Sequence, residues 1–367
     1  MTSTGPKGWI ALAAGGTGGH MFPAQAVAQE LKRRDWQILL LTDARGMRYG
    51  DGFPADEIIT LSAANPNVRG LSAKVSMARA MATGVRQARQ ALRRLKPRMV
   101  IGFGGYPSAP GLFAARSLGL PYGVHEQNAV LGRVNRRAAP RARFVAHGFS
   151  QLERLPQIKG QLVQTGNPVR DKVRAIADRP YPAIEKGGPL HILIFGGSQG
   201  ASLFGRVFAP ALASFPKEMK DRLRITHQVS DADHARVASI YEAAGLHVEL
   251  APFFTDLPDR MANAHFVISR AGASTVSELA VIGRPSLLVP LGIAMDDHQR
   301  GNAQVLVKAG AADLLLEADA TPERATALLL PRLSGEEDLA LRAAAAKGQV
   351  PIDAAGRLAN VMETNLV

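Results

Sequence analysis

The chain has 367 residues, 46% of them hydrophobic, a length that exceeds one ordinary core and predicts two domains. It contains no cysteine, which excludes disulfides, thiolate metal sites and a cysteine nucleophile. The formal net charge of +13 is uneven, because residues 1–180 hold 27 Lys and Arg against 10 Asp and Glu, whereas the remaining residues hold 17 against 21, so the first half is expected to meet a polyanionic surface.

The first predicted elements are a strand, a glycine loop and a helix. Residues 9–14, WIALAA, are typical of a short buried strand, and residues 24–34 carry apolar side chains at helical spacing. GGTGGH lies between them and ends at His20. The first N–H groups of a helix are unpaired, so a loop at this point favours anions. It matches neither the dinucleotide pattern GxGxxG nor a P-loop, which leaves sugar nucleotides and lipid diphosphates as the expected ligands.

A strand at 37–42 comes next, followed by a long basic segment. Residues 69–98 carry nine Lys and Arg, no acid, and interleaved apolar side chains. This pattern fits a helix lying on anionic lipid, and it also fits a solvated helix whose apolar side packs inward. Nucleic acid is not expected, because aromatic residues are only 5% of the chain and none interleaves the basic run. Neither a transmembrane helix nor a signal peptide is evident, so we expect a cytoplasmic protein with peripheral membrane contact.

The remaining strands of the first half are predicted at 98–103, 121–125 and 143–147. The first of them runs into a second glycine turn, GFGGYPS. The second ends in HEQN, residues 125–128, a polar set that is either functional or a structural network of buried groups. A cluster of five arginines follows between residues 133 and 143.

The second half is expected to repeat this organisation. A Pro/Gly-rich segment at 179–189 is predicted as the linker. HILIFGGSQGA then repeats the strand, glycine loop and helix start 181 residues after the first loop, and further strands are predicted at 224–229, 247–252, 265–270, 285–291 and 312–316. Alternating strands and helices predict parallel sheets covered on both faces. We therefore expect two doubly wound domains facing each other across a cleft, with the three glycine loops at the carboxyl ends of strands.

Three polar motifs of the second half have competing interpretations. SRAGASTVSELA, residues 269–280, fits a capping box of Thr275 with Glu278, and equally a set of donors for a phosphate with Glu278 on a ribose. DDHQRGNA, residues 296–303, resembles a sugar-hydroxyl site more than a metal site, because it has only one histidine and its two carboxylates are adjacent. Residues 231–233, DAD, are expected to start a helix rather than to bind a metal diphosphate.

Six motifs occur in the order found in the MurG-type glycosyltransferases: GGTGGH, GFGGYPS, HEQN, GNPVR, GGSQGA and SRAGASTVSELA. The chain resembles this family from about residue 9 to at least residue 312. The resemblance implies the α/β GT-B fold of two Rossmann-like domains. Residues 1–165 would be the domain facing acceptor and membrane, residues 166–350 would bind the UDP-sugar, and residues 351–367 would form a helix crossing back to the first domain.

The resemblance also implies an activity. It is the inverting transfer of N-acetylglucosamine from UDP-N-acetylglucosamine to the C4 hydroxyl of undecaprenyl-diphospho-muramoyl-pentapeptide, a step of peptidoglycan synthesis that serves cell shape and division. No metal and no cofactor would be needed. The implied partners are UDP-N-acetylglucosamine, the lipid-linked diphosphate acceptor and the anionic membrane surface at the cytoplasmic face of the plasma membrane.

The residues that match the family's motifs are given roles by the resemblance. His20 would be the base near the acceptor hydroxyl, with Tyr106 and Glu126 close by, and a histidine titrating near neutral pH suits this work. Glu278 would contact the ribose. The residues implied to hold UDP-N-acetylglucosamine are Thr17, Gly18, Gly19, Asn128, Arg170, Ser198, Gln199, Phe254, Ala273, Ser274, Thr275, Val276, Ser277, Glu278 and Gln299. Three positions depart from the family pattern: His298 replaces a glutamine, and Ser274 and Phe254 replace larger or aliphatic residues.

Three alternatives remain at this stage. A UDP-N-acetylglucosamine 2-epimerase would share the fold and the donor without a lipid acceptor, but such enzymes lack the combination of GGTGGH and HEQN. An NAD-dependent oxidoreductase could use Asp43 on a cofactor ribose, although the broken glycine pattern argues against it. A non-enzymatic basic scaffold at the membrane would leave His20 and Glu278 dispensable.

Overall fold

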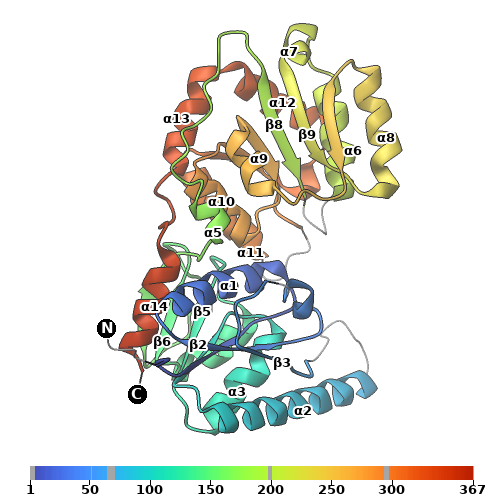
Figure 1. Ribbon diagram of the computed structural model, residues 1–367. Helices are drawn as coiled ribbons and strands as arrows, with labels where there is room; N and C mark the ends of the chain where they lie inside the picture. The colour runs from blue at the N-terminus through green and yellow to red at the C-terminus, as the bar shows by residue number, and fades with distance from the viewer. Residues whose placement is uncertain (1–4, 51, 64–70, 197–200, 293–296, 367) are drawn as a thin grey trace. The chain divides into compact units, whose positions relative to one another are not determined.

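The computed structural model describes residues 5–50, 52–63, 71–196, 201–292 and 297–366. The chain divides into two compact units (Figure 1). The first comprises Met1–Arg170 with Pro351–Val367, and the second comprises Asp171–Val350. The chain therefore passes from one unit to the other twice, once after Arg170 and once after Val350.

The first unit is built on a seven-stranded parallel sheet. Its strand order is β3-β2-β1-β4-β5-β6-β7, and Ile10 pairs with Ile38 on one side of β1 and with Met99 on the other. The change of direction in this order places the switch point, where ligands bind in such sheets, between β1 and β4. The strands are β1 (Trp9–Ala13), β2 (Gln37–Thr42), β3 (Glu57–Thr60), β4 (Met99–Gly102), β5 (Tyr122–Glu126), β6 (Phe144–His147) and β7 (Gln161–Gln164).

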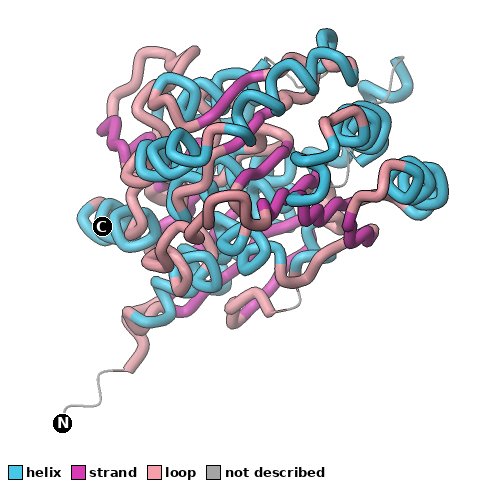
Figure 2. The backbone as a smooth tube through the Cα atoms, turned by 90° about the horizontal axis from the view of Figure 1, so that it is seen from above, coloured by secondary structure: helices cyan, strands magenta, loops and turns pink. Residues whose placement is uncertain are grey.

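Helices cover both faces of this sheet, because its central strands are apolar on both sides. On one face, Leu12 and Leu40 lie in a core with Val27 of α1 (Gly18–Arg33) and Leu358 of α14 (Ala354–Thr364). On the other face, Val100 lies in a core with the remaining helices of the unit, and in Figure 2 the strands are flanked by helices. Those helices are α2 (Leu71–Leu95), α3 (Ala109–Ser117) and α4 (Arg133–Ala138), with the short η3 (Ala139–Arg141). The short η2 (Tyr106–Ser108) precedes α3, and η1 (Gly46–Tyr49) packs on the opposite face, where its Tyr49 contacts the core of α1.

The second unit repeats the same topology with six parallel strands. Its order, β10-β9-β8-β11-β12-β13, corresponds strand for strand to the first six positions of the first sheet. The strands are β8 (Leu190–Phe195), β9 (Leu223–Gln228), β10 (His247–Ala251), β11 (Phe266–Ser269), β12 (Ser286–Leu288) and β13 (Ala312–Leu314). The helices are α5 (Asp171–Arg174), α6 (Ala201–Ala213), α7 (Lys217–Arg222), α8 (Asp231–Ala243), α9 (Leu257–Asn263), α10 (Ala273–Ile282), α11 (His298–Lys308), η6 (Glu317–Asp319), α12 (Pro322–Ser334) and α13 (Glu336–Ala346). The predicted fold of two Rossmann-like domains is confirmed.

The structure differs from the sequence expectation at two edge strands and at the linker. Every predicted strand is present, but β3 and β7 were missed. The segment 179–189 lies inside the second unit and does not connect the units. Its Tyr181 packs against the core of that unit, and the Tyr181 hydroxyl donates to the carbonyl oxygen of His265 at 2.8 Å.

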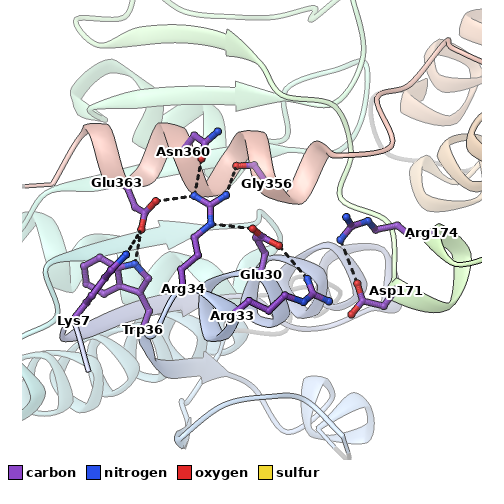
Figure 3. A network of polar contacts seen from close by, with 10 residues as sticks. All are labelled: Lys7, Glu30, Arg33, Arg34, Trp36, Asp171, Arg174, Gly356, Asn360 and Glu363. Carbon is purple, nitrogen blue, oxygen red and sulfur yellow. Dashed lines mark hydrogen bonds and ion pairs between the residues drawn. The ribbon is translucent and has the colours of Figure 1, made fainter. Parts of the chain in front are cut away.

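The C-terminal helix α14 is fastened to the first unit by a charged network as well as by apolar contacts (Figure 3). The Glu363 carboxylate accepts from Arg34 Nη1 at 2.7 Å and from Trp36 Nε1 at 2.8 Å, and Lys7 Nζ lies 3.4 Å away. Arg34 also donates to Glu30 of α1 at 2.9 Å. Because α1 begins at the first glycine loop, α14 supports the scaffold on which that loop stands.

Replacing Glu363 by alanine is expected to lower the free energy of unfolding by about 1–2 kcal/mol, because three donors lose a partly exposed acceptor. Urea unfolding measures the change. Arg357→Ala is the matched control on the same helix, since among the described residues the Arg357 guanidinium bonds only to Asp353, four positions earlier. It should cost less than about 0.5 kcal/mol. Equal losses of unfolding free energy in the two variants would contradict a stabilising role for the charged network between α14 and α1.

Candidate functional site

The first glycine loop joins β1 to α1 at the switch point of the first sheet. Gly16 has φ +81°, and its N–H donates to Asp43 Oδ1 at 2.9 Å. A Cβ on Gly15 would lie 2.7 Å from the same oxygen, so only glycine fits. Thr17 is the N-cap of α1, but its side chain accepts no capping hydrogen bond from a backbone N–H of the helix. The helix begins at Gly18, earlier than the sequence indicated, so His20 lies in its first turn.

His20 is half-buried and is held between the two glycine turns. Its Nδ1 lies 3.2 Å from Thr17 Oγ1. On the other side, a Cβ on Gly105 would lie 3.0 Å from His20 Cε1, and one on Gly104 would lie 3.6 Å from Nε2. The backbone explains this contact, because β1 and β4 are neighbours and Phe103 N donates to Ala13 O at 2.9 Å. Tyr106 follows Gly105 directly, so His20 and Tyr106 come from adjoining turns.

Glu126, at the end of β5, is the centre of a second polar cluster. It is only 2% exposed. Oε1 accepts from the backbone N of Asn128 at 3.1 Å and from its Nδ2 at 2.9 Å, while Oε2 accepts from Gly132 N and from Asn135 Nδ2, both at 2.9 Å. Four donors occupy about all the accepting positions of a carboxylate. Glu126 therefore fixes the turn after β5 and with it the side chain of Asn128.

Asn135 connects the Glu126 cluster to the glycine turn beside His20. A Cβ on Gly104 would lie 3.2 Å from Asn135 Nδ2, the nitrogen that also donates to His125 O at 3.0 Å. Sequence reasoning missed Asn135, since nothing local distinguishes it from the flanking arginines of α4.

The other two residues of HEQN are structural. His125 is fully buried. The Nδ1 atom of His125 lies 3.0 Å from Gln127 Nε2, and the Nε2 atom of His125 lies 3.0 Å from Gly166 O. An amide N–H can only donate, so Nδ1 accepts and Nε2 donates to the Gly166 carbonyl. Burial lowers the pKa of His125 to about 4, which keeps the ring neutral near pH 7.

Arg170 reaches the same region through Phe22. Its guanidinium carbon lies 4.5 Å from the centroid of the Phe22 ring, a cation–π contact. Phe22 belongs to the start of α1, and a Cβ on Gly18 would lie 2.8 Å from its ring. The structure thus brings the candidates of the first unit to one edge of its sheet; they are Thr17, Gly18, Gly19, His20, Tyr106, Glu126, Asn128 and Arg170.

In the second unit, α10 begins directly after β11. Its N-cap is Gly272, so Thr275 lies inside the first turn, and the capping-box interpretation, one of the two left open by the sequence, is wrong. The physical reason is that Gly272 already has the extended conformation of a cap, with φ −63° and ψ 146°. Ser274 Oγ is buried without a hydrogen-bond partner among the described residues. Ser277 Oγ donates to Ala273 O at 2.8 Å, and Glu278 is only 5% exposed.

Helix α11 is held against the start of α10. Asn302 Nδ2 donates to Ala271 O at 3.1 Å, and Gln299 Oε1 accepts from Leu291 N at 3.0 Å. Two further residues that sequence reasoning missed, Arg270 and Glu317, form an ion pair at 3.0 Å. They are 47 positions apart, so no local signal joins them.

Phe254 lies in the loop after β10 and is 7% exposed, with the guanidinium carbon of Arg260 4.3 Å from its ring centroid. Phe253 beside it is 71% exposed. Ser198 and Gln199 lie outside the described residues, as does Asp296 of the DDHQ motif. Within the parts of the chain that the structure covers, no three His, Asp or Glu side chains gather as metal ligands would.

Two Rossmann-like units in one chain, with loops of small residues at the carboxyl ends of their strands, define the class of the two-domain GT-B enzymes. Solved structures of this fold that are similar to the chain include the UDP-GlcNAc 2-epimerase from Neisseria meningitidis bound to UDP-GlcNAc, at 15% identity, TM-score 0.66 and coverage of 97% of this chain and 100% of the other. At this identity the similarity shows the fold alone.

The chain belongs to glycosyltransferase family 28. The N-terminal domain of the family matches residues 10–147 and its C-terminal domain matches residues 191–358. The resemblance predicted from the six motifs is thereby confirmed, and the chain is a glycosyltransferase.

Close relatives carry one name, UDP-N-acetylglucosamine–N-acetylmuramyl-(pentapeptide) pyrophosphoryl-undecaprenol N-acetylglucosamine transferase. The protein of Maricaulis maris is 45% identical over 353 residues, 96% of each chain. That of Methylobacterium sp. strain 4-46 is 48% identical over 358 residues, 97% of this chain and 96% of the relative. The crystal structure of Acinetobacter baumannii MurG is 31% identical, covers 97% of this chain and 99% of that one, and has a TM-score of 0.78.

Proposed function

We propose that this chain transfers N-acetylglucosamine from UDP-N-acetylglucosamine to the C4 hydroxyl of N-acetylmuramyl-(pentapeptide) pyrophosphoryl-undecaprenol, with inversion at the anomeric carbon. The observation that carries the proposal is the shared name of relatives 43–48% identical to the chain over at least 95% of its length. Their function requires a sugar nucleotide and a lipid diphosphate, the two ligand types that the first glycine loop favours.

In this transfer the acceptor hydroxyl attacks the anomeric carbon and must lose its proton as the new bond forms, while the bond to the UDP oxygen breaks. His20 is the base in our proposal. With Nδ1–H donating to Thr17 Oγ1, 3.2 Å away, Nε2 keeps the lone pair that takes the proton. The Gly104–Gly105 turn holds the imidazole from the other side. Tyr106 lies next in the chain, and we propose that it contacts the acceptor.

The departing UDP carries negative charge, and we propose that backbone and side-chain donors stabilise it. The first N–H groups of α10, which have no acceptor within the helix, and the hydroxyl of Ser274, which has no partner among the described residues, suit a phosphate. Arg170 adds a positive charge, and Glu278 takes the ribose hydroxyls. The other donor-binding residues are proposed as the family motifs imply them: Thr17, Gly18, Gly19, Asn128, Ser198, Gln199, Phe254, Ala273, Thr275, Val276, Ser277 and Gln299.

Glu126 has a positioning role in this scheme. Its two oxygens are occupied by four donors of the chain, so it is not free to exchange a proton with substrate. Its hydrogen bonds hold the side chains of Asn128 and Asn135 in place beside the glycine turn.

The Gly104–Gly105 turn gives a direct test of how tightly His20 must be held. Gly105→Ala places a Cβ 3.0 Å from His20 Cε1 and is expected to lower kcat about tenfold or more by displacing the imidazole. Gly119→Ala is the matched control, because Gly119 has nearly the same φ, +68° against +70°, and, apart from its chain neighbours, no described residue lies within 4 Å of its Cβ position. Both variants should lose about 1–2 kcal/mol of stability from the left-handed backbone. If kcat is equal in the two, the turn does not position His20.

The membrane is the third partner we propose, and α2 is the element that meets it. Its first turns project from the rest of the unit (Figure 1), and residues 74–79 are all exposed, including Val75 at 46% and Met77 at 39%. The helix carries Lys74, Arg79 and further arginines without any acid. Among the described residues, no helix is both long and apolar enough to span a bilayer. We therefore propose peripheral binding to the anionic cytoplasmic face of the plasma membrane.

Flotation with vesicles tests this contact. Each Lys or Arg near an anionic surface contributes about 1 kcal/mol, so replacing Lys74, Arg79 and Arg86 by Gln is expected to lower the partition coefficient onto phosphatidylglycerol vesicles by more than about tenfold. Replacing Lys186, Lys308 and Arg324 of the second unit removes the same charge and should change it less than about threefold. Equal binding to neutral phosphatidylcholine, or equal losses in both variants, would contradict the proposal.

A UDP-N-acetylglucosamine 2-epimerase would share the fold, but its reaction can be distinguished from sugar transfer. An epimerase acting at C2 of the sugar exchanges the C2 hydrogen with solvent without any acceptor. Incubation with UDP-N-acetylglucosamine in D₂O is expected to leave C2 undeuterated by mass spectrometry. Deuterium at C2 would favour the epimerase.

A further inference from the structure

Asp43, at the end of β2, joins the first glycine loop to the neighbouring loop. It is 5% exposed, and its Oδ1 accepts from Gly16 N and from Gly46 N, both at 2.9 Å. Gly46 is closely packed here, since a Cβ on it would lie 2.1 Å from Thr42 Oγ1. The sequence offered Asp43 as a ribose ligand of a dinucleotide, but its carboxylate is engaged with the protein itself.

The other oxygen of Asp43 holds an arginine over the glycine loop. Arg45 Nε donates to Asp43 Oδ2 at 2.9 Å, and the Arg45 side chain is 51% exposed. The bond uses only Nε, so the two terminal nitrogens are not spent on Asp43. Nη2 lies 3.6 Å from the position that a Cβ on Gly16 would take. The first turn of α1 contains no acidic residue that would compete for this guanidinium.

We infer that Arg45 is a further binding residue for the diphosphate group of a substrate, and that Asp43 is the positioning residue that sets both Arg45 and Gly16 in place. A guanidinium suits this ligand because its planar set of donors matches phosphate oxygens. The inference rests on the proposed function, in which both the sugar nucleotide and the lipid-linked acceptor carry a diphosphate. The two residues that it adds to the site, Asp43 and Arg45, lie on the loop after β2.

The test compares Arg45→Gln with Arg48→Gln. Arg48 is exposed on the short helix η1, of which Arg45 is the N-cap, and its replacement removes the same charge. Among the described residues, no side-chain contact joins Arg48 to Gly16 or Asp43. The first probe is inorganic pyrophosphate, whose binding by calorimetry requires no turnover. Arg45→Gln is expected to weaken its affinity about 5- to 20-fold, the loss of one partly solvated charge-assisted contact, and Arg48→Gln less than twofold.

Steady-state kinetics then identify the source of the diphosphate. We expect Arg45→Gln to raise the KM of either UDP-N-acetylglucosamine or the lipid acceptor by a similar factor, with kcat changed less than about threefold. Asp43→Asn should also raise that KM, and adding Arg45→Gln to it should have little further effect, since Arg45 has then lost its tether. A merely structural Asp43 would not produce this coupling.

The inference is overturned if wild type does not bind pyrophosphate, or if Arg45→Gln matches Arg48→Gln in pyrophosphate affinity and in both KM values. The outcome is distinguishable from failure of the proposed function. If wild type transfers no sugar but Arg45→Gln alone weakens pyrophosphate binding, the proposed function fails and the diphosphate contact stands.

Discussion

Replacing His20 by alanine is expected to lower kcat by about 10²- to 10⁴-fold, the usual contribution of a positioned general base. The reason is geometric. His20 lies between Thr17 Oγ1, 3.2 Å from its Nδ1, and the Gly104–Gly105 turn, so the alanine variant loses the only imidazole at that position. The side chain is half-buried at the start of α1, so its removal should leave the fold intact. Stopped-time transfer assays at saturating substrates measure the effect.

Two controls make this result specific to base catalysis. The dissociation constant of UDP-N-acetylglucosamine, measured by calorimetry, should change less than about twofold in His20→Ala. Thr17→Val removes the partner of Nδ1 but keeps the imidazole, and should give an intermediate loss of about tenfold. A kcat within threefold of wild type in His20→Ala would show that another group takes the proton.

Replacing Glu126 by glutamine is expected to lower the free energy of unfolding by about 2–4 kcal/mol, because a buried carboxylate that accepts four hydrogen bonds is replaced by a side chain with one acceptor and an NH₂ facing two donors. The kcat should fall as well, since Asn128 and Asn135 lose the group that fixes them. Urea unfolding and transfer assays, both below the unfolding transition, measure the two effects.

The pH dependence separates positioning from proton transfer at Glu126. If Glu126 acts by holding Asn128 and Asn135, the profile of log kcat/KM against pH should shift downward in the glutamine variant without losing a limb. Glu153→Gln is the matched control in the adjoining loop, where the residue is exposed, and should cost less than about 0.5 kcal/mol. Loss of the acidic limb in Glu126→Gln would mean that Glu126 itself titrates in the reaction.

The central strands and the glycine loops were predictable because their signals are local. Runs such as QILLLT are apolar on both faces, as a buried parallel strand requires, and each glycine loop follows such a run. The edge strands lack this signal. Three of the four residues of β7 are exposed, and β3 ends in an exposed threonine, so neither is an apolar run. β3 and β7 are strands because they pair with β2 and β6 at the two ends of the sheet, and no local sequence pattern predicts such pairing.

The residues that support the site were harder to predict than the residues that match the family's motifs. Asn135 and Asp43 act through partners 9 and 27 positions away, and the Arg270–Glu317 pair spans 47. Arg45 bonds to Asp43 only two positions away, but nothing in that spacing shows that it lies over Gly16. The sequence left a capping box open for a related reason: the spacing of Thr275 and Glu278 allowed it, but the helix begins at Ala273 after a suitable glycine. Local spacing cannot decide which of two possible caps the backbone uses.

The measurement that tests the account most directly is the transfer of labelled N-acetylglucosamine from its UDP carrier to a short-chain muramoyl-pentapeptide lipid diphosphate, by the full chain in the presence of excess EDTA. We expect one labelled sugar per acceptor, joined at the C4 hydroxyl with inverted configuration, at a rate that EDTA does not change. Binding of UDP-N-acetylglucosamine without formation of this product would contradict the proposed function.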